Sequence, residues 1–137
     1  MNQIPRYPLW LGHAGDCRDP ERLSDLDIEA VIQLATEEPP PTLPRDTLFL
    51  RIPLHDGSGN HVSRLRLAVE VAAGLLRDRV PTLVCCSAGA SRSPAIAACA
   101  LAVAEEKPAS ECLRLVQSSH ATDLSPGLWH DLLSLLH

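Results

Sequence analysis

The stretch VCCSAGASRSP, from Val84 to Pro94, joins an apolar run to an alanine-rich segment through a loop of small residues. The preceding run, Thr82 to Cys85, is apolar on both faces, as expected of a buried central strand. The following segment, Arg92 to Glu105, is rich in alanine and has Pro94 in its first turn, where proline is tolerated. The stretch therefore predicts a strand, a tight loop and a helix in succession.

The rest of the chain repeats this alternation of strands and helices. Short apolar runs predict three further strands, near Leu9–Leu11, Val31–Leu34 and Leu48–Ile52. A three-and-four spacing of apolar side chains predicts a helix before the central strand: Val62, Leu65, Val69, Ala72 and Leu76. Two more helices are expected, one after Pro108 and one after Pro126. The pattern predicts an α/β fold with a central, mostly parallel sheet flanked by helices.

Length and composition narrow the class of protein. The chain has 137 residues, which predicts a single domain over residues 1–137 with a sizeable core. Its formal net charge of -5 argues against nucleic acid or an acidic membrane as a partner, because both need a basic face. No apolar run is long enough to span a membrane.

The five cysteines are scattered and form no CxxC pair. Nothing near His13 and Cys17 completes a metal site, so we expect neither a metal nor a cofactor. The start of the chain has no signal-peptide pattern. Free thiols in a reducing cytoplasm are therefore expected.

The loop between the predicted strand and helix has the features of an anion cradle. Backbone N–H groups can converge in such a loop, and the following helix adds its positive N-terminal end. Phosphate suits this site, and Arg92 can bind two of its oxygens at once. The residues expected to bind phosphate are Ser87, Ala88, Gly89, Ala90, Ser91 and Arg92.

Cys86 lies at the base of this cradle. The positive surroundings favour its thiolate, and a thiolate beneath a bound phosphate is a nucleophile aimed at phosphorus. Ser93 can donate its hydroxyl to that thiolate when the intermediate is hydrolysed. Asp56, in the loop LHDGSGN after the strand that ends near Ile52, is the candidate general acid. Cys86, Arg92, Asp56 and Ser93 are thus the predicted catalytic residues.

CSAGASRS resembles the CxxGxxR[ST] signature of the cysteine-dependent protein tyrosine phosphatases, in the form typical of dual-specificity phosphatases. Asp56, 30 residues before Cys86, matches the place of that family's general acid. PLWLG, IPLHDG, SRSPAIAACALA and SPGLWHDLLSLL are similar to its opening strand, acid loop, loop-following helix and closing helix. The resemblance implies a protein tyrosine phosphatase-like fold and a metal-independent reaction through a phosphocysteine, inhibited by vanadate-like anions.

One residue departs from the family pattern. The family usually has histidine immediately before the nucleophile, and this chain has Cys85. We expect Cys85 to be a small buried strand residue. The alternative is a redox role that protects Cys86 from over-oxidation, with Cys17 or Cys99 as partners of better geometry.

The expected substrate is a phosphorylated protein or peptide, at phosphotyrosine and at phosphoserine or phosphothreonine. Two alternatives stay open: a catalytically weak pseudophosphatase that binds phosphate, and a phosphatase of glycans, lipids or nucleic-acid 5′ ends. Three histidines are expected at surface positions near helix ends: His120, His130 and His137.

Overall fold

Within residues 1–136, which the computed structural model describes, five strands form one sheet in the order β1-β2-β5-β3-β4. The strands are β1 (Asn2–Gln3), β2 (Leu9–Gly12), β3 (Ala30–Ala35), β4 (Leu48–Leu54) and β5 (Thr82–Cys85). β2, β5, β3 and β4 are parallel, and only β1 pairs antiparallel, with β2. The predicted mostly parallel α/β sheet is confirmed.

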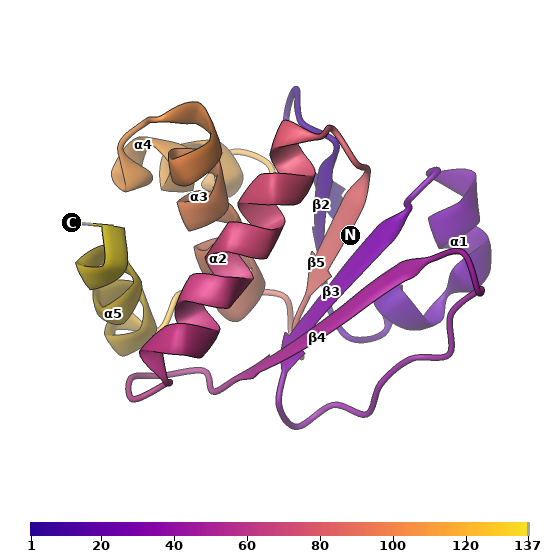
Figure 1. Ribbon diagram of the computed structural model, residues 1–137, viewed down its shortest axis with the longest axis horizontal. Helices are drawn as coiled ribbons and strands as arrows, with labels where there is room; N and C mark the ends of the chain where they lie inside the picture. Colours follow the sequence, from indigo (N-terminus) through magenta and orange to yellow (C-terminus); the bar gives the residue numbers. More distant parts are fainter. Residues whose placement is uncertain (137) are drawn as a thin grey trace.

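Helices cover both faces of this sheet (Figure 1). α2 (Val62–Arg77), α3 (Arg92–Glu105), α4 (Ala109–Gln117) and α5 (Pro126–Leu136) lie on one side. The short η1 (Asp16–Arg18) and α1 (Pro20–Asp25) lie on the other. In the described residues no helix is long and apolar enough to cross a membrane. His137, predicted at a surface position, lies outside the described residues.

Three short elements, β1, η1 and α1, were not predicted from the sequence. β1 has two residues, too few for any periodic pattern. α1 has six residues and buries only Leu23, so it shows no apolar stripe. Its capping signals are nevertheless in the sequence: Pro20 begins the helix, and the Asp19 side chain accepts a hydrogen bond from the Arg22 N–H at 3.2 Å.

α3 is the central helix and is buried along most of its length, from Arg92 to Ala102. Alanine at five of these eleven positions lets α2, α4 and α5 all pack against it. Burying this helix places its first turn, with Arg92 and Ser93, beneath the protein surface.

β5 divides its side chains between two cores, because successive strand residues point to opposite faces. Val84 and Cys86 belong to the larger core with the four long helices. Leu83 and Cys85 belong to a smaller core with Cys17. The carboxyl ends of the four parallel strands meet at one edge of the sheet, where ligands bind in open α/β folds.

Candidate active site

The loop from Cys86 to Arg92, named here the cradle loop, runs from the end of β5 into α3. It rests on the residues that follow β2: the Cys86 N–H donates to Gly12 O at 3.4 Å, and the Ala14 N–H donates to Ser87 O at 3.0 Å. Gly89 has a φ of 78°, and a Cβ there would lie 2.8 Å from the Gly12 carbonyl atoms. Glycine is therefore required at this position both by conformation and by space.

Cys86 lies at the base of the cradle loop with 2% of its surface exposed. Its Sγ accepts a hydrogen bond from the Ser93 N–H at 3.4 Å, and the Ser93 Oγ lies 3.5 Å away. Both groups belong to the first turn of α3, whose N-terminal end carries partial positive charge. The structure thus places the sulfur where a developing negative charge is stabilised.

Arg92 is held by Glu37, a residue of the segment after β3. Arg92 Nη1 donates to Glu37 Oε1 and Nη2 to Glu37 Oε2, both at 2.7 Å. Arg92 Nη1 also donates to Leu54 O at 2.9 Å. The hydrogen bonds from Arg92 lower the pKa of Glu37 from 4.5 to about 2, and the same contact raises the pKa of Arg92. The two side chains are therefore an ion pair at neutral pH.

These contacts leave one edge of the Arg92 guanidinium open. A guanidinium has five N–H donors, and Glu37 and Leu54 accept from the two Nη atoms. The Arg92 Nε is buried and has no partner among the described residues. Nε and the second hydrogen of Nη2 form a fork of the kind that binds two oxygens of a phosphate. A buried donor without a partner needs an explanation, and an anion in the cradle supplies one.

Asp56 follows β4 and lies at the same edge of the sheet as the cradle loop. Its Oδ1 accepts a hydrogen bond from Ser91 Oγ at 2.5 Å. Ser91 Oγ in turn accepts from the Ser125 N–H at 2.9 Å. Ser91 therefore joins the loop that carries Asp56 to the start of α5, in addition to its place in the cradle loop.

Asn60 stabilises the loop that carries Asp56. Its Oδ1 accepts from the His55 N–H at 2.8 Å, and its Nδ2 donates to His55 O at 3.0 Å and Gly57 O at 3.2 Å. The Gly59 N–H donates to Asp131 of α5 at 3.1 Å. The Asn60 side chain and Asp131 of α5 therefore both fix the conformation of this loop.

A cavity of about 320 Å³ brings these groups together. It is lined by Glu37, Asp56, Cys86, Ser87, Ala88, Ala90, Ser91, Arg92 and Asp123. Three carboxylates and a single cation are among them, and Glu38 lies beside the cavity through a hydrogen bond from Ser87 Oγ at 2.9 Å. No aromatic side chain lines this cavity. Its lining is therefore acidic and has no aromatic wall.

His120 contacts the cradle loop from the segment after α4. Its Nε2 lies 2.5 Å from Gly89 O, and its Nδ1 lies 2.9 Å from Asn2 Nδ2. The Gly89 carbonyl can only accept, so His120 Nε2 donates to it, and Ser93 Oγ donates to the same oxygen at 3.4 Å. His120 is half-buried and lies just after α4, near a helix end as predicted. Its contacts with the cradle loop and the N-terminal segment were not predicted from the sequence.

Cys85 is fully buried on the opposite face of β5 from Cys86. A hydrogen bond with the Cys17 side chain and burial both raise the pKa of the Cys85 thiol, so it stays protonated at neutral pH. The expectation of a buried strand residue is confirmed. Cys99, the other partner considered, is buried inside α3.

Cys86, Arg92 and Asp56 line one cavity with four of the predicted phosphate-binding residues of the loop: Ser87, Ala88, Ala90 and Ser91. Gly89 and Ser93 are not among its lining residues, and Ser93 is buried with its Oγ 3.5 Å from the Cys86 Sγ. The chemical roles of all these residues stay predictions. Sequence reasoning missed Glu37 and His120. A signal for Glu37 was present, because an acidic residue just after a buried parallel strand lies at the functional edge of the sheet. No comparable signal marked His120, whose contact joins residues distant in the sequence.

The sequence matches the family described as dual specificity phosphatase, catalytic domain, over residues 9–135. No match was found among curated protein sequences. Solved structures with a similar fold include human DUSP28, with a TM-score of 0.86 and 21% identity, covering 98% of this chain and 94% of that chain. The human tyrosine phosphatase-like serine/threonine/tyrosine-interacting protein has a TM-score of 0.83 and 19% identity over 99% of this chain and 95% of that chain.

A viral structure is also similar. OH1 from the Orf virus, described as a tyrosine phosphatase that displays triple substrate specificity, has a TM-score of 0.74. It is 22% identical and covers 97% of this chain and 84% of that chain. At these identities the likeness of all three structures shows a shared fold.

Proposed function

Because the chain belongs to the dual specificity phosphatase family, we propose that it is a single catalytic domain that hydrolyses phosphomonoesters through a phosphocysteine intermediate. The observation that carries this proposal is the arrangement around Cys86 and Arg92. Cys86 lines the same cavity as Arg92, whose guanidinium Glu37 already holds in place. A phosphate bound by the open edge of that guanidinium and by the cradle N–H groups would rest directly above the thiolate.

In the first step the Cys86 thiolate attacks phosphorus and forms an S–P bond, while the bond from phosphorus to the substrate oxygen breaks. Asp56, as a carboxylic acid, gives its proton to the departing oxygen, so that an alcohol or phenol leaves. Arg92 and the cradle loop stabilise the charge on the equatorial oxygens. Asp56 lines the same cavity as Cys86, which supports this role.

In the second step a water attacks the phosphocysteine, and the Asp56 carboxylate takes a proton from that water. The S–P bond breaks, inorganic phosphate forms and the Cys86 thiolate is released. Ser93 supports its departure, because the Ser93 hydroxyl lies 3.5 Å from the sulfur. The negative charge at every stage is balanced by Arg92, the cradle N–H groups and the N-terminal end of α3, so the steps need no metal ion.

The test is hydrolysis of p-nitrophenyl phosphate in reducing buffer with EDTA, with wild type compared with Cys86→Ser. We expect turnover in wild type, complete loss in Cys86→Ser and competitive inhibition by vanadate. Cys86→Ser should still bind vanadate, whereas Arg92→Ala should lose both binding and turnover. A rate that EDTA abolishes, or no turnover by folded and reduced wild type, would contradict the proposal. Absence of turnover by folded and reduced wild type would indicate a non-enzymatic phosphate-binding protein.

For the substrate we propose phosphotyrosine and phosphoserine or phosphothreonine in proteins. The absence of aromatic residues from the cavity lining supports this choice, because no ring is placed to stack on a phenyl group and select phosphotyrosine alone. Comparing phosphopeptides with phosphorylated lipids and glycans as substrates tests it. A higher kcat/KM on a lipid or glycan would instead make the chain a phosphatase of non-protein substrates. OH1, which has this fold, is described as having triple substrate specificity.

The proposed location is a reducing compartment such as the cytoplasm. All five cysteines are free and buried, which supports a setting where thiols stay reduced.

A further inference from the structure

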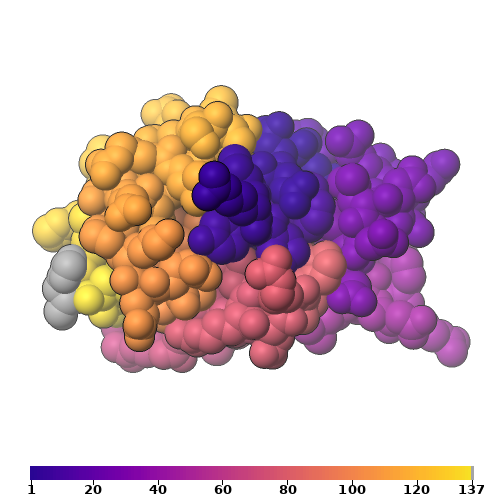
Figure 2. All heavy atoms as spheres, turned by 90° about the horizontal axis from the view of Figure 1, so that it is seen from above, coloured from indigo at the N-terminus to yellow at the C-terminus, as the bar shows by residue number. Residues whose placement is uncertain are grey.

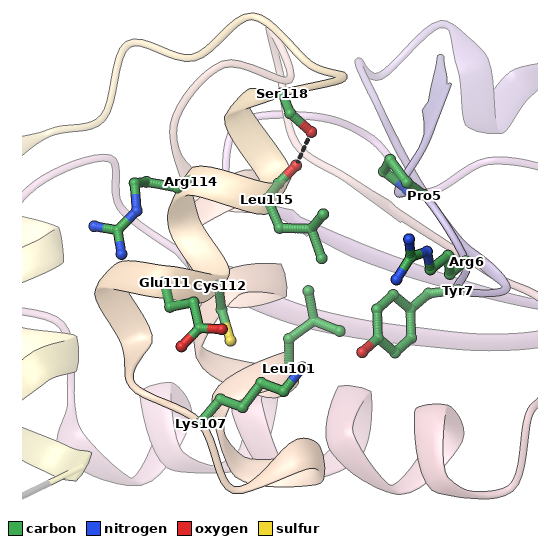
Figure 3. A pocket seen from close by; sticks show the side chains of 10 residues that line it. All are labelled: Pro5, Arg6, Tyr7, Leu101, Lys107, Glu111, Cys112, Arg114, Leu115 and Ser118. Carbon is green, nitrogen blue, oxygen red and sulfur yellow. Dashed lines mark hydrogen bonds between the residues drawn. The ribbon is translucent and has the colours of Figure 1, made fainter.

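A second cavity, of about 580 Å³, lies between the N-terminal turn and α4 (Figure 3). Seen from above in Figure 2, the indigo N-terminal residues lie beside the orange residues of α4. The cavity shares no lining residue with the catalytic cavity of about 320 Å³. None of the proposed catalytic steps uses it.

The floor of this second cavity is apolar. Leu101 of α3 and Cys112 of α4 are buried there, with 1% and 4% of their surfaces exposed. The half-buried side chains of Tyr7 and Leu115 extend the apolar surface toward the rim. In Figure 3 the two leucines and the tyrosine ring face one another across the hollow. Such a floor accepts an apolar side chain rather than a charged one.

The rim carries positive charge in a protein whose formal net charge is -5. Arg6, Lys107 and Arg114 line the cavity, and Glu111 is the single acidic residue among the lining side chains. Within residues 1–136, the three cationic side chains form no ion pair and no hydrogen bond. Their charges are therefore available to an anionic partner.

Arg6 occupies an unusual place for a long side chain. The Tyr7 N–H donates to Ile4 O at 3.1 Å, which closes a turn with Pro5 and Arg6 at its centre. Arg6 has a φ of 73°, at the turn position where glycine or asparagine is favoured. In Figure 3 its guanidinium points toward the hollow. Strained positions of this kind occur preferentially at sites that bind a ligand.

We propose that this docking cavity binds an acidic peptide segment of a phosphoprotein substrate, with one bulky apolar side chain on the floor and carboxylates on the cationic rim. The inference rests on the proposed phosphatase function. Charge complementarity selects the acidic segment, and the apolar floor selects the anchoring side chain. The lining of the catalytic cavity is acidic and has no aromatic residue, so a second contact would supply affinity for an acidic peptide that the catalytic cavity does not.

The distance between the two cavities suits a single peptide. Leu101 follows Arg92 by nine positions in α3, which corresponds to roughly 14 Å along the helix axis. Ser118 lines the docking cavity, and His120, two positions later, contacts Gly89 of the cradle loop. An extended chain spans about 3.3 Å per residue, so a spacer of about four to six residues reaches from one site to the other.

The test begins with binding of a fluorescein-labelled peptide of sequence EDLLDE, measured by fluorescence anisotropy. Arg6→Glu/Lys107→Glu is expected to raise its Kd at least tenfold. The control Arg22→Glu/Arg45→Glu reverses two exposed charges on α1 and in the segment between β3 and β4, and should leave the Kd within twofold. Hydrolysis of p-nitrophenyl phosphate should be unchanged in both variants, because neither touches the catalytic cavity.

The second arm uses phosphotyrosine peptides with EDLLDE attached through a five-residue spacer or replaced by a neutral sequence. The attached segment is expected to raise kcat/KM at least tenfold in wild type and to have no effect in Arg6→Glu/Lys107→Glu. Equal peptide binding by wild type and this variant would overturn the proposal. Binding to phosphatidylserine vesicles, without peptide binding, would also overturn it and assign the cavity to a membrane surface. Absence of turnover in wild type would instead count against the proposed phosphatase function, since anisotropy does not depend on turnover.

Discussion

Glu37 determines which edge of the Arg92 guanidinium is open to a phosphate, since it accepts from both Nη atoms. Glu37→Gln keeps one acceptor oxygen but loses the charge and the bidentate geometry. We expect kcat/KM for p-nitrophenyl phosphate to fall about tenfold, which is about 1.4 kcal/mol. Glu29→Gln, an exposed change next to the start of β3, is the control for loss of one charge. Tighter vanadate binding by Glu37→Gln would show that Glu37 competes with the substrate.

The same ion pair predicts an acid dependence of stability. Folding lowers the pKa of Glu37 from 4.5 to about 2, so its contribution is fully present above pH 4.5 and is lost as the pH falls toward 2. The difference in urea midpoint between wild type and Glu37→Gln should be constant from about pH 7 to pH 5 and shrink at lower pH. A difference that grows on acidification would contradict this sign.

His120 acts on the cradle loop through the Gly89 carbonyl. His120→Ala should weaken vanadate inhibition about three- to tenfold, because the Gly89 carbonyl then keeps only the longer hydrogen bond from Ser93 Oγ, at 3.4 Å. His120→Gln should recover most of that loss, since its amide N–H can donate in the same direction. Equal losses in both variants would show that the imidazole matters only as packing.

At the scale of elements, the loop between β5 and α3 depends on a backbone that only glycine adopts without strain. Gly89→Ala should destabilise the fold by about 1–3 kcal/mol and abolish vanadate binding, because its Cβ would lie 2.8 Å from Gly12 atoms. Gly74→Ala is the matched control, in α2 with no atom within 4 Å of the new Cβ. It should stabilise the helix by about 0.5–1 kcal/mol. Thermal and urea unfolding measure the two changes in the free energy of unfolding, which should have opposite signs.

At the scale of the whole molecule, charge is distributed unevenly between the two cavities. The catalytic mouth holds Glu37, Asp56 and Asp123, and Glu38 lies beside it. Phosphopeptides with arginine or lysine next to the phosphorylated residue should therefore have a kcat/KM about tenfold above acidic ones at low salt. The preference should shrink at about 1 M salt, where charges are screened beyond roughly 3 Å. If the preference for basic phosphopeptides did not depend on salt, the shape of the side chains and not their charge would be its cause.

The order of elements could be predicted from the sequence because their signals are local. Apolar runs marked β2, β3, β4 and β5, and the spacing of apolar residues marked α2. The small residues between Cys86 and Arg92 indicated an anion cradle, because a strand-to-helix loop of that composition has few other uses. Asp56 could be placed at the same edge of the sheet once the strands were taken as parallel.

The tertiary structure alone decided the contacts that join distant segments. Glu37 begins the proline-rich stretch EEPPPTLPRD, which has no periodic pattern, yet the fold brings Glu37 against Arg92, 55 positions later. His120 meets Gly89 and Asn2 only when α4 packs beside the N-terminal segment. The docking cavity likewise needs residues from both ends of the chain. The spacing of apolar residues along one stretch indicates whether that stretch is a helix or a strand. These contacts depend instead on how several elements pack together, and no single stretch of the chain carries that information.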